Sequence, residues 1–455
     1  MRRAVQFGFV VALLGGWRPL ALLAQESVPA PGDTRTQQTV NDEFTQARPT
    51  DDPSSRGEDT TLGSQQREEP VYAGSLNGSG LIAMDESAEK HLLFSMMTGG
   101  GWDTNPGNME KASSSAVYSL SPYLGYRMAT QRLQSIVQYQ PTFLGYNSEV
   151  YARQSLHRAS GSMLFTQSER LTWKADAFGN YGPNGTRLLS SPQAVAVGEV
   201  PGASGASSAS YLGNSSNLTY VAGSVSAAYR LSEQDTIAVT GTNAYSRTSD
   251  LNQQGGIANL QVAYTRAVSE TVSWNGYAQG GHFYGDLAYE TYGAGGGFRW
   301  RPRERTSFSV SAGPQFTTCS CASSKTGLTY SVSLGTRIAD KWQVYALTDH
   351  LPTVSYLGPS LWQRSASGGV QYQVTQIGVI SADVGYISSD TLTAVSSYRG
   401  ISWGVNYGFH LPHGLAVLYT YRGYATNTGG AETNRNLAQA SITWTYRGGE
   451  VFQGR

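Results

Sequence analysis

Alternation of apolar and small polar residues dominates this chain. From Thr306 to Phe316 every second residue is apolar, and the residues between them are Ser, Gly or Gln. A two-residue period places the apolar side chains on one face of an extended strand and the polar ones on the other. Repeated between turns, such segments are typical of transmembrane β-strands, with lipid on one face and a wet lumen on the other. The pattern predicts an all-β fold, a transmembrane antiparallel up-and-down β-barrel.

The same alternation persists from about Leu92 to Arg447. It is clearest in five further segments: 116–127, 137–143, 328–335, 401–409 and 439–446. Tyr and Trp concentrate near the ends of these segments, as they do where barrel strands cross the lipid interfaces. A soluble sandwich could also alternate, but its apolar faces would pack on each other over shorter strands. We therefore predict an outer-membrane barrel over residues 91–448.

The connections between strands alternate between tight and long. Tight turns are predicted near 129–131, 168–170, 232–235, 268–270, 302–304, 340–341, 375–376 and 412–414. Longer connections are predicted near 104–113, 146–153, 183–216, 247–255, 283–288, 317–326, 351–361, 388–394 and 425–436. Short turns face the periplasm and long loops the cell exterior in such barrels. Nine long and eight tight connections predict about 18 strands. The number falls to 16 if one weakly patterned hairpin, near 247–268 or 352–370, is merged into its neighbouring strands.

The N-terminal region has a different composition. Arg2 and Arg3 precede an apolar run, and Ala24 is a plausible cleavage residue, so residues 1–24 read as a signal peptide. An uncleaved interfacial helix is the alternative. Residues 25–90 are polar and charged and predict a disordered periplasmic leader. It is a flexible segment, a tether to a periplasmic partner or to the cell wall, or a plug, and the flexible segment is favoured. Residues 449–455 predict a short periplasmic tail.

Composition excludes several functional classes. Charged residues make up only 14% of the chain and the formal charge is zero, which gives no case for nucleic-acid binding. Removal of residues 1–24 leaves 29 basic against 32 acidic residues, a formal charge of about −3. No apolar run reaches 18 residues, which argues against a helical membrane protein. The lumen-facing positions are mainly Ser, Thr, Gly, Gln and Asn, so we expect weak charge selectivity, with arginines limiting the mouths.

A family resemblance rests on the first third of the barrel. The residues that carry it are Gly-Gly-Gly-Trp-Asp-Thr-Asn at 99–105, Ser-Leu-Ser-Pro-Tyr-Leu-Gly-Tyr-Arg at 119–127, Val-Gln-Tyr-Gln-Pro at 137–141 and the turn at 164–173. This order resembles the outer-membrane β-barrel porin family that is often linked to exopolysaccharide gene clusters. The resemblance implies a large barrel with a transport role and supplies no catalytic residues. Such barrels usually end on an aromatic residue that the assembly machinery reads, whereas here Arg447–Arg455 follows Tyr446.

Few residues suggest chemistry of their own. Cys319 and Cys321 could bind a soft metal or form a small-ring disulfide, but an incidental loop pair is favoured. His410 and His413 flank Pro412, which argues against a helical metal site. The other histidines, His91, His157, His282 and His350, could serve a hydrolase only beside Ser or Asp partners. Asp103 and Asn105 could ligate calcium, although a turn is their commoner role.

The sequence therefore predicts a channel rather than an enzyme. We expect an outer-membrane, porin-like channel of a Gram-negative bacterium for small hydrophilic solutes, with no catalytic, cofactor or metal site residues and no cofactor. The alternatives are an exit pore for a secreted exopolysaccharide and a closed structural or adhesive barrel. Loop 183–216 either folds inward to narrow the channel or caps it. The expected partners are membrane lipid or lipopolysaccharide, the outer-membrane assembly machinery and a periplasmic protein bound by the leader.

Overall fold

Eighteen strands make up the part of the chain that the computed structural model describes. This part is residues 90–446, without 108–112, 148–152, 184–216, 249–252, 286–287, 304–305, 320–321, 339–340, 356–357, 376, 392–397, 412–414 and 429–430. The predicted signal peptide, nearly all of the predicted leader, loop residues 184–216, Cys321, His413 and the C-terminal tail lie outside these residues. No helix among the described residues is long and apolar enough to span a membrane.

The strands follow one another along the chain with short connections. The first nine are β1 (Lys90–Asp103), β2 (Ser115–Ala129), β3 (Leu133–Tyr146), β4 (Gln154–Thr166), β5 (Leu171–Pro183), β6 (Asn217–Arg230), β7 (Asp235–Thr248), β8 (Gln253–Ser269) and β9 (Val272–Gly285). The second nine are β10 (Tyr289–Arg303), β11 (Thr306–Cys319), β12 (Ala322–Ile338), β13 (Trp342–Ser355), β14 (Gly358–Gln373), β15 (Gly378–Thr391), β16 (Tyr398–Leu411), β17 (Leu415–Thr428) and β18 (Ala431–Tyr446).

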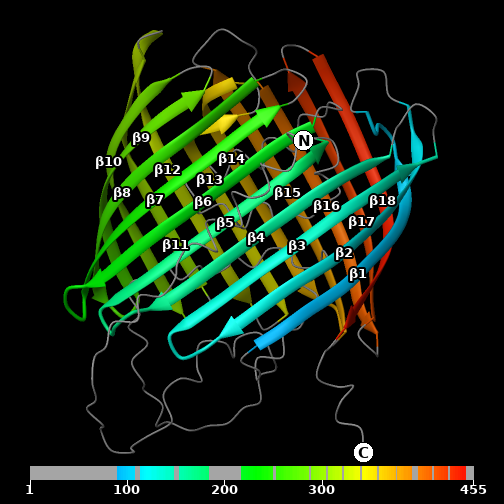
Figure 1. Ribbon diagram of the computed structural model, residues 1–455, viewed down its shortest axis with the longest axis horizontal. Coiled ribbons are helices and arrows are strands. Elements are labelled where there is room, and N and C mark those ends of the chain that lie inside the picture. The colour runs from blue at the N-terminus through cyan, green and yellow to red at the C-terminus, as the bar shows by residue number, and fades with distance from the viewer. Residues whose placement is uncertain are drawn as a thin grey trace, which may run out of the picture. The chain divides into compact units, whose positions relative to one another are not determined.

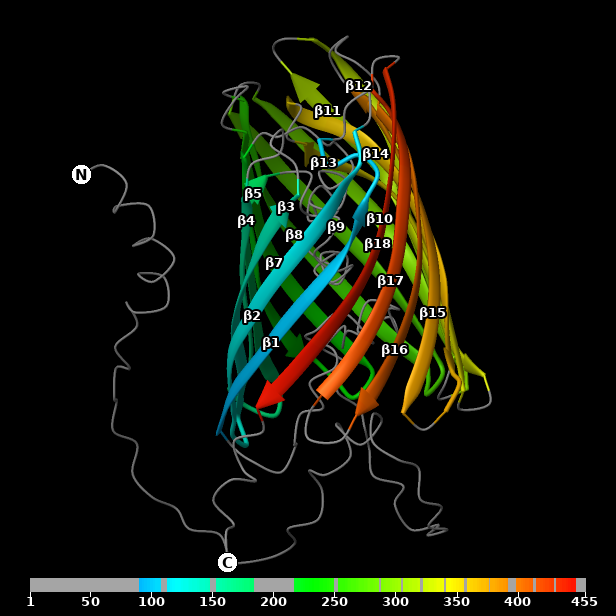
Figure 2. The same cartoon turned by 90° about the vertical axis from the view of Figure 1, so that its right-hand side faces the viewer.

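Each strand pairs antiparallel with its neighbours in sequence, and β1 pairs with both β2 and β18. The sheet therefore closes into a barrel without a free edge (Figures 1 and 2). Closure satisfies the backbone hydrogen bonds within the sheet, which a lipid environment requires. The predicted up-and-down barrel of 18 strands is confirmed, and the two weakest segments of the sequence pattern form β8 and β14.

The strands are longer than the membrane requires. They contain 13 to 17 residues, whereas about 10 suffice to cross a bilayer. Several predicted long connections are therefore wrong, since β11 ends at Cys319 and β12 begins at Ala322, and likewise β13 ends at Ser355 and β14 begins at Gly358. The predictions for 247–255, 283–288 and 425–436 also placed strand residues in loops. Polar residues at these strand ends stay in the ladder because backbone pairing does not depend on an apolar side chain.

The two faces of the sheet differ as the alternation predicts. In β2, Leu120 and Leu124 are exposed on the outside between Tyr118 and Tyr126, whereas Ser119 and Ser121 are buried on the inside. The same split recurs around the barrel, with exposed apolar side chains such as Val239, Leu260, Val384 and Ile401 on its exterior. An apolar exterior flanked by aromatic residues is the surface that a β-barrel presents to lipid.

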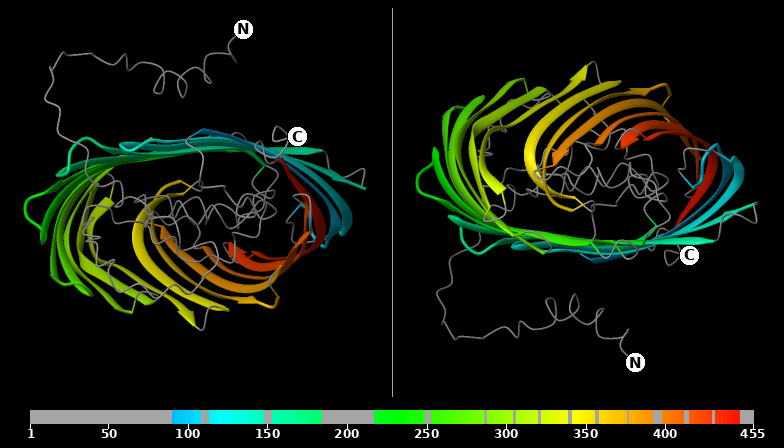
Figure 3. Two further views of the ribbon diagram at one scale, coloured as in Figure 1. Left: turned by 90° about the horizontal axis from the view of Figure 1, so that it is seen from below. Right: turned by 90° about the horizontal axis from the view of Figure 1, so that it is seen from above.

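The ring of strands is oval when viewed along the barrel axis (Figure 3). In addition to their ladder partners, β13 and β14 lie close to β7, β8 and β9. These strands are not neighbours in the sheet. The wall itself therefore brings two of its sides together, and the lumen is narrowed between them.

Candidate functional site

The inner wall of the barrel is the candidate functional surface. Hydroxyl and amide side chains that point inward bond to one another across neighbouring strands. Ser121 Oγ donates to Thr142 Oγ1 at 2.9 Å, and Ser309 Oγ lies 2.6 Å from Ser333 Oγ. Buried polar side chains of the inner face include Ser119, Thr242, Asn259, Gln315, Thr329, Ser381, Asn406 and Thr443. The prediction that lumen-facing positions are mainly small and polar holds for these strands.

Inward glycines let polar side chains meet across an intervening strand. Gln279 of β9 donates from Nε2 to Gln315 Oε1 of β11 at 2.7 Å, although β10 lies between them. Gly293 occupies the middle position of this row, paired with Gln279 on one side and Gln315 on the other. A Cβ at residue 293 would collide with the Gln315 side chain. The glycine thus keeps the amide pair flat against the wall.

Near the middle of the wall, a charged pair also meets across an intervening strand at an inward glycine. Asp383 of β15 and Arg422 of β17 both pair with Gly404 of β16. Arg422 Nη2 lies 4.0 Å from Asp383 Oδ1. A Cβ at residue 404 would lie 2.8 Å from that Asp383 oxygen. Both side chains belong to the middle of strands that cross the membrane, so charge is not confined to the mouths as the sequence suggested.

Basic side chains outnumber acidic ones on the described inner wall. The strand register places four aspartates inward: Asp103, Asp176, Asp349 and Asp383. It places nine basic residues with described side chains inward: Arg127, Arg158, Lys174, Arg230, Arg299, Arg301, Lys325, Arg422 and Arg435. Lys174 lies 3.6 Å from Asp176. The wall therefore carries fixed positive charge over much of its height, which its Ser and Thr content alone does not reveal.

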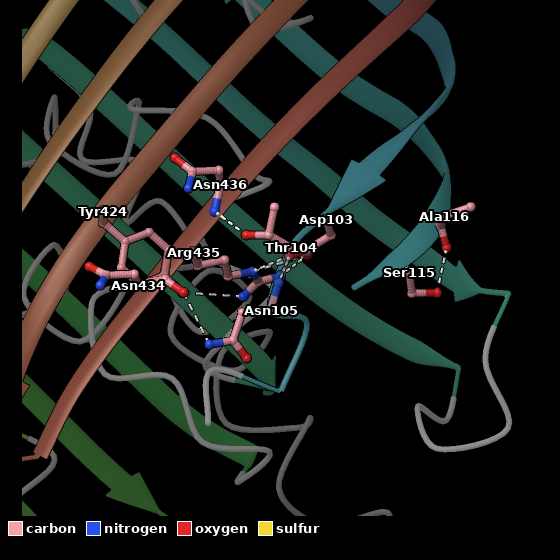
Figure 4. A network of polar contacts seen from close by, with 9 residues as sticks. All are labelled: Asp103, Thr104, Asn105, Ser115, Ala116, Tyr424, Asn434, Arg435 and Asn436. Atoms are coloured by element: carbon pink, nitrogen blue, oxygen red, sulfur yellow. Dashed lines mark hydrogen bonds and ion pairs between the residues drawn. The ribbon is translucent and has the colours of Figure 1, made fainter. Parts of the chain in front are cut away.

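A buried ion pair joins the first and last strands at the long-loop end. Arg435 of β18 donates from Nε to both carboxylate oxygens of Asp103 of β1, at 2.9 and 3.0 Å, and from Nη1 to Tyr424 Oη at 3.3 Å (Figure 4). The Asp103 side chain is 0% exposed and that of Arg435 is 2% exposed. Two hydrogen bonds to one carboxylate give the pair a fixed geometry. It holds the closure of the barrel at this end.

The residues after Asp103 attach the first loop to β18. The backbone N–H of Asn105 donates to Asp103 Oδ1 at 3.0 Å, and Asn105 Nδ2 donates to the Asn434 carbonyl at 3.1 Å (Figure 4). The backbone N–H of Asn436 donates to Thr104 Oγ1 at 2.8 Å. Asp103 and Asn105 thus have the turn role that was the commoner prediction. No group of three or more potential metal ligands occurs among the described residues. The pairing with Arg435 was not predicted, because residues 332 positions apart carry no local signal.

An apolar cluster covers part of the inner wall. It joins inward residues of six consecutive strands: Phe178, Tyr220, Ala222, Ala244, Ile257, Phe283 and Tyr289. The rings of Phe283 and Tyr289 stack with centroids 4.0 Å apart. These strands include β7, β8 and β9, which β13 and β14 approach. The sequence left open whether loop 183–216 narrows the channel or caps it, and residues 184–216 lie outside the described part of the chain. Within the described part, the wall strands themselves approach one another.

The remaining candidate residues, the histidines and cysteines, lie on the outside of the barrel or have side chains outside the described residues. His157 lies 2.7 Å from Tyr139 Oη, and His282 Nδ1 lies 2.7 Å from Glu290 Oε1, both on the exterior. His350 is also on the exterior, with Nδ1 2.7 Å from the Leu328 carbonyl oxygen. Cys319 ends β11, while its side chain and those of His91 and His410 are outside the described set. The three histidines with described side chains, His157, His282 and His350, lie on three separate strands, β4, β9 and β13.

The barrel's own surface places it in a membrane. Its exterior is apolar between aromatic residues, its sheet has no edge, and its inner face is polar. Closed barrels with an even number of strands, short turns at one end and this division of faces are typical of bacterial outer membranes. The protein is an outer-membrane β-barrel. Short turns such as those at 130–132 and 231–234 mark the periplasmic end in barrels of this kind, so the opposite end, where β1 ends at Asp103, is the extracellular one.

Solved structures of similar fold are outer-membrane channels and receptors. OpdL of Pseudomonas aeruginosa is 9% identical, with a TM-score of 0.42 over 79% of this chain and 99% of that chain. OccAB4 of Acinetobacter baumannii is 8% identical, with a TM-score of 0.39 over 79% of this chain and 99% of that one. The ferric citrate transporter FecA is 10% identical, with a TM-score of 0.35 over 74% of this chain and 60% of that chain. No family model and no curated protein matches the sequence.

Proposed function

We propose that the protein is a porin-like channel for small hydrophilic solutes. The observation that carries this proposal is the closed ring of 18 strands with a polar and charged inner face. Barrels of 16 to 18 strands are wide enough to enclose an aqueous channel, whereas 8-stranded barrels are filled by their side chains. Hydroxyl, amide and charged groups on the wall replace part of the hydration shell of a passing solute. The approach of β13 and β14 toward β7, β8 and β9 limits the solute size.

Cysteine accessibility tests the channel directly. Thr240 points inward, where its hydroxyl donates to Ser226 Oγ at 3.0 Å, and the adjacent Val239 is 40% exposed on the outside. The variants Thr240→Cys and Val239→Cys are made with Cys319 and Cys321 replaced by serine. Both are refolded and measured in planar bilayers before and after a charged, water-soluble thiol reagent. The reagent is expected to reduce the single-channel current of Thr240→Cys and to leave that of Val239→Cys unchanged.

Two results would contradict the proposal. Absence of ohmic current from correctly folded protein would favour the closed structural or adhesive barrel. Equal sensitivity of the two cysteine variants would mean that the current does not pass through the lumen. Passage of a secreted polysaccharide stays a prediction of the family resemblance. A periplasmic partner of the leader stays a prediction from the composition of residues 25–90.

A further inference from the structure

A row of polar and basic side chains crosses the outside of the barrel at its extracellular end. His350 of β13 pairs with Arg364 of β14, Arg364 pairs with Ser388 of β15, and Ser388 pairs with Arg399 of β16. The alternation of the strands turns all four toward the exterior, and both arginines are exposed. Neighbouring strands lie about 4.8 Å apart, so the two arginine backbones are about 10 Å apart. We call these four residues the outer basic row.

The outer basic row lies directly above the apolar belt. Two residues closer to the periplasm, the same strands present Thr348, Ala366, Tyr386 and Ile401 to the outside. Exposed apolar residues continue below them, including Val384 and Ile380 on β15 and Val405 and Tyr407 on β16. A side chain at the upper border of such a belt is at the depth of the lipid headgroups of the outer leaflet. Arginines there can extend their charge into the headgroup layer.

The histidine of the row is held in place. His350 Nδ1 lies 2.7 Å from the carbonyl oxygen of Leu328, at the end of the pairing between β12 and β13. Its ring also lies against Trp362 and Tyr330, with centroids 5.2 and 5.5 Å away. These contacts fix the imidazole on the outside of β13, at the residue that pairs with Arg364 of β14. The nearest described acidic side chain along the row is Glu432 on β18, where it accepts from Asn427 Nδ2 at 3.5 Å.

We propose that His350, Arg364, Ser388 and Arg399 bind the phosphorylated headgroup of a lipid in the extracellular leaflet. Guanidinium groups bind phosphate oxygens through two parallel hydrogen bonds. Two arginines about 10 Å apart suit a headgroup with two phosphates, and Ser388 between them supplies a hydroxyl donor. The depth of the row selects a lipid rather than a soluble phosphate, because the acyl chains of the same molecule contact the belt below. This surface is on the outside of the barrel and does not depend on the channel function.

Lipid retention by the full chain tests this surface. The protein is refolded in a nonionic detergent, mixed with bisphosphorylated lipid A, and examined by native mass spectrometry for bound lipid. Arg364→Ser with Arg399→Ser is compared with Arg153→Ser with Arg247→Ser, which removes two other exposed arginines at the extracellular end. The first double variant is expected to need roughly 30-fold more lipid for equal occupancy, as follows from removing two cations beside an anionic headgroup at about 1 kcal/mol each. The control pair is expected to bind like the natural protein.

A second arm keeps the test decisive if the double variant misfolds. The natural protein is mixed with lipid A from which both phosphates have been removed, and the heat-dependent gel mobility of every sample confirms a folded barrel. Loss of binding on dephosphorylation and weakening at high salt are expected. Equal retention of the two lipid forms would overturn the proposal, as would equal losses in the two double variants.

Discussion

At the residue scale, the buried pair of Asp103 and Arg435 is the feature with the clearest energetic consequence. Removing one partner leaves an unpaired charge where neither side chain reaches solvent. Such a loss costs about 3 to 5 kcal/mol, whereas replacing both partners by apolar groups can be nearly neutral. Arg435→Met is therefore expected to lower the free energy of unfolding in detergent by about 3 kcal/mol, as measured by denaturant titration.

The double variant distinguishes the ion pair from general damage. Asp103→Leu combined with Arg435→Met is expected to recover part of the stability that Arg435→Met loses. Glu432→Gln, an exposed change on the same strand, serves as the control and is expected to have an effect within about 0.5 kcal/mol. If the losses of the two single variants simply add in the double variant, the two residues are not coupled.

Gly404 permits a test of the contact between Asp383 and Arg422. Gly404→Val places a side chain between two charged groups of the lumen wall, and the Asp383 carboxylate must move. We expect this variant to shift the single-channel current and to destabilise the barrel by about 1 to 3 kcal/mol, the usual cost of overpacking. Gly335→Val is the matched control, because Gly335 also faces the lumen and a Cβ there would meet only Ser307 Oγ, at 3.5 Å. Equal behaviour of the two variants would contradict a role for the space at Gly404.

Sequence analysis did not single out Asp383 or Arg422, and it assigned Asp103 to a turn. It therefore identified neither these residues as parts of the lumen wall nor their partners. Their contacts depend on the strand register, which aligns Asp383, Gly404 and Arg422 in one row across three strands. A single sequence does not contain that register, because a two-residue shift preserves the alternation. Sequence analysis therefore missed both the ion pairs and the outer basic row.

At the element scale, the same substitution is expected to have different effects on stability at the two faces of one strand. Leu260 of β8 is 56% exposed near the middle of the apolar exterior, and Gln261 beside it faces the lumen. Leu260→Arg places a charge in lipid, which costs about 2 to 4 kcal/mol at the bilayer midplane. Gln261→Arg places it in the polar lumen and is expected to cost less than about 1 kcal/mol. Folding yield into lipid vesicles at increasing urea measures both, and equal losses would contradict the assignment of faces.

Strands were easier to predict than their ends. The alternation together with the count of tight and long connections predicted about 18 strands, with 16 left open, and the structure has 18, including the weakly patterned β8 and β14. It failed at the extracellular ends, where residues such as Thr317, Thr318 and Thr426 alternate no longer but remain paired. The alternation of apolar and polar residues ends where the strands leave the lipid, because only the lipid requires an apolar outer face. The backbone hydrogen bonds between strands continue beyond that point. The number of strands could thus be obtained from sequence, and the lengths of the connections could not.

At the scale of the whole molecule, the lumen charge has a measurable consequence. Nine basic and four acidic side chains of the described wall point inward, and three of the acids lie beside basic partners: Asp103 by Arg435, Asp176 by Lys174, and Asp383 by Arg422. A pair of opposite charges contributes little net field at the distance of a passing ion. The remaining positive charge raises the local concentration of anions. Reversal potentials in a potassium chloride gradient are therefore expected to show a preference for chloride over potassium.

Salt dependence separates this field from simple size selection. The Debye length falls from about 10 Å at 0.1 M salt to about 3 Å at 1 M, so fixed wall charges lose their influence on ions near the axis. The chloride preference is expected to be largest in dilute salt and to approach zero in concentrated salt. Size selection alone would give no such dependence, because the width of the wall does not change with ionic strength. A preference for potassium in dilute salt would mean that the inward-facing charges of the described wall do not set the potential along the ion path.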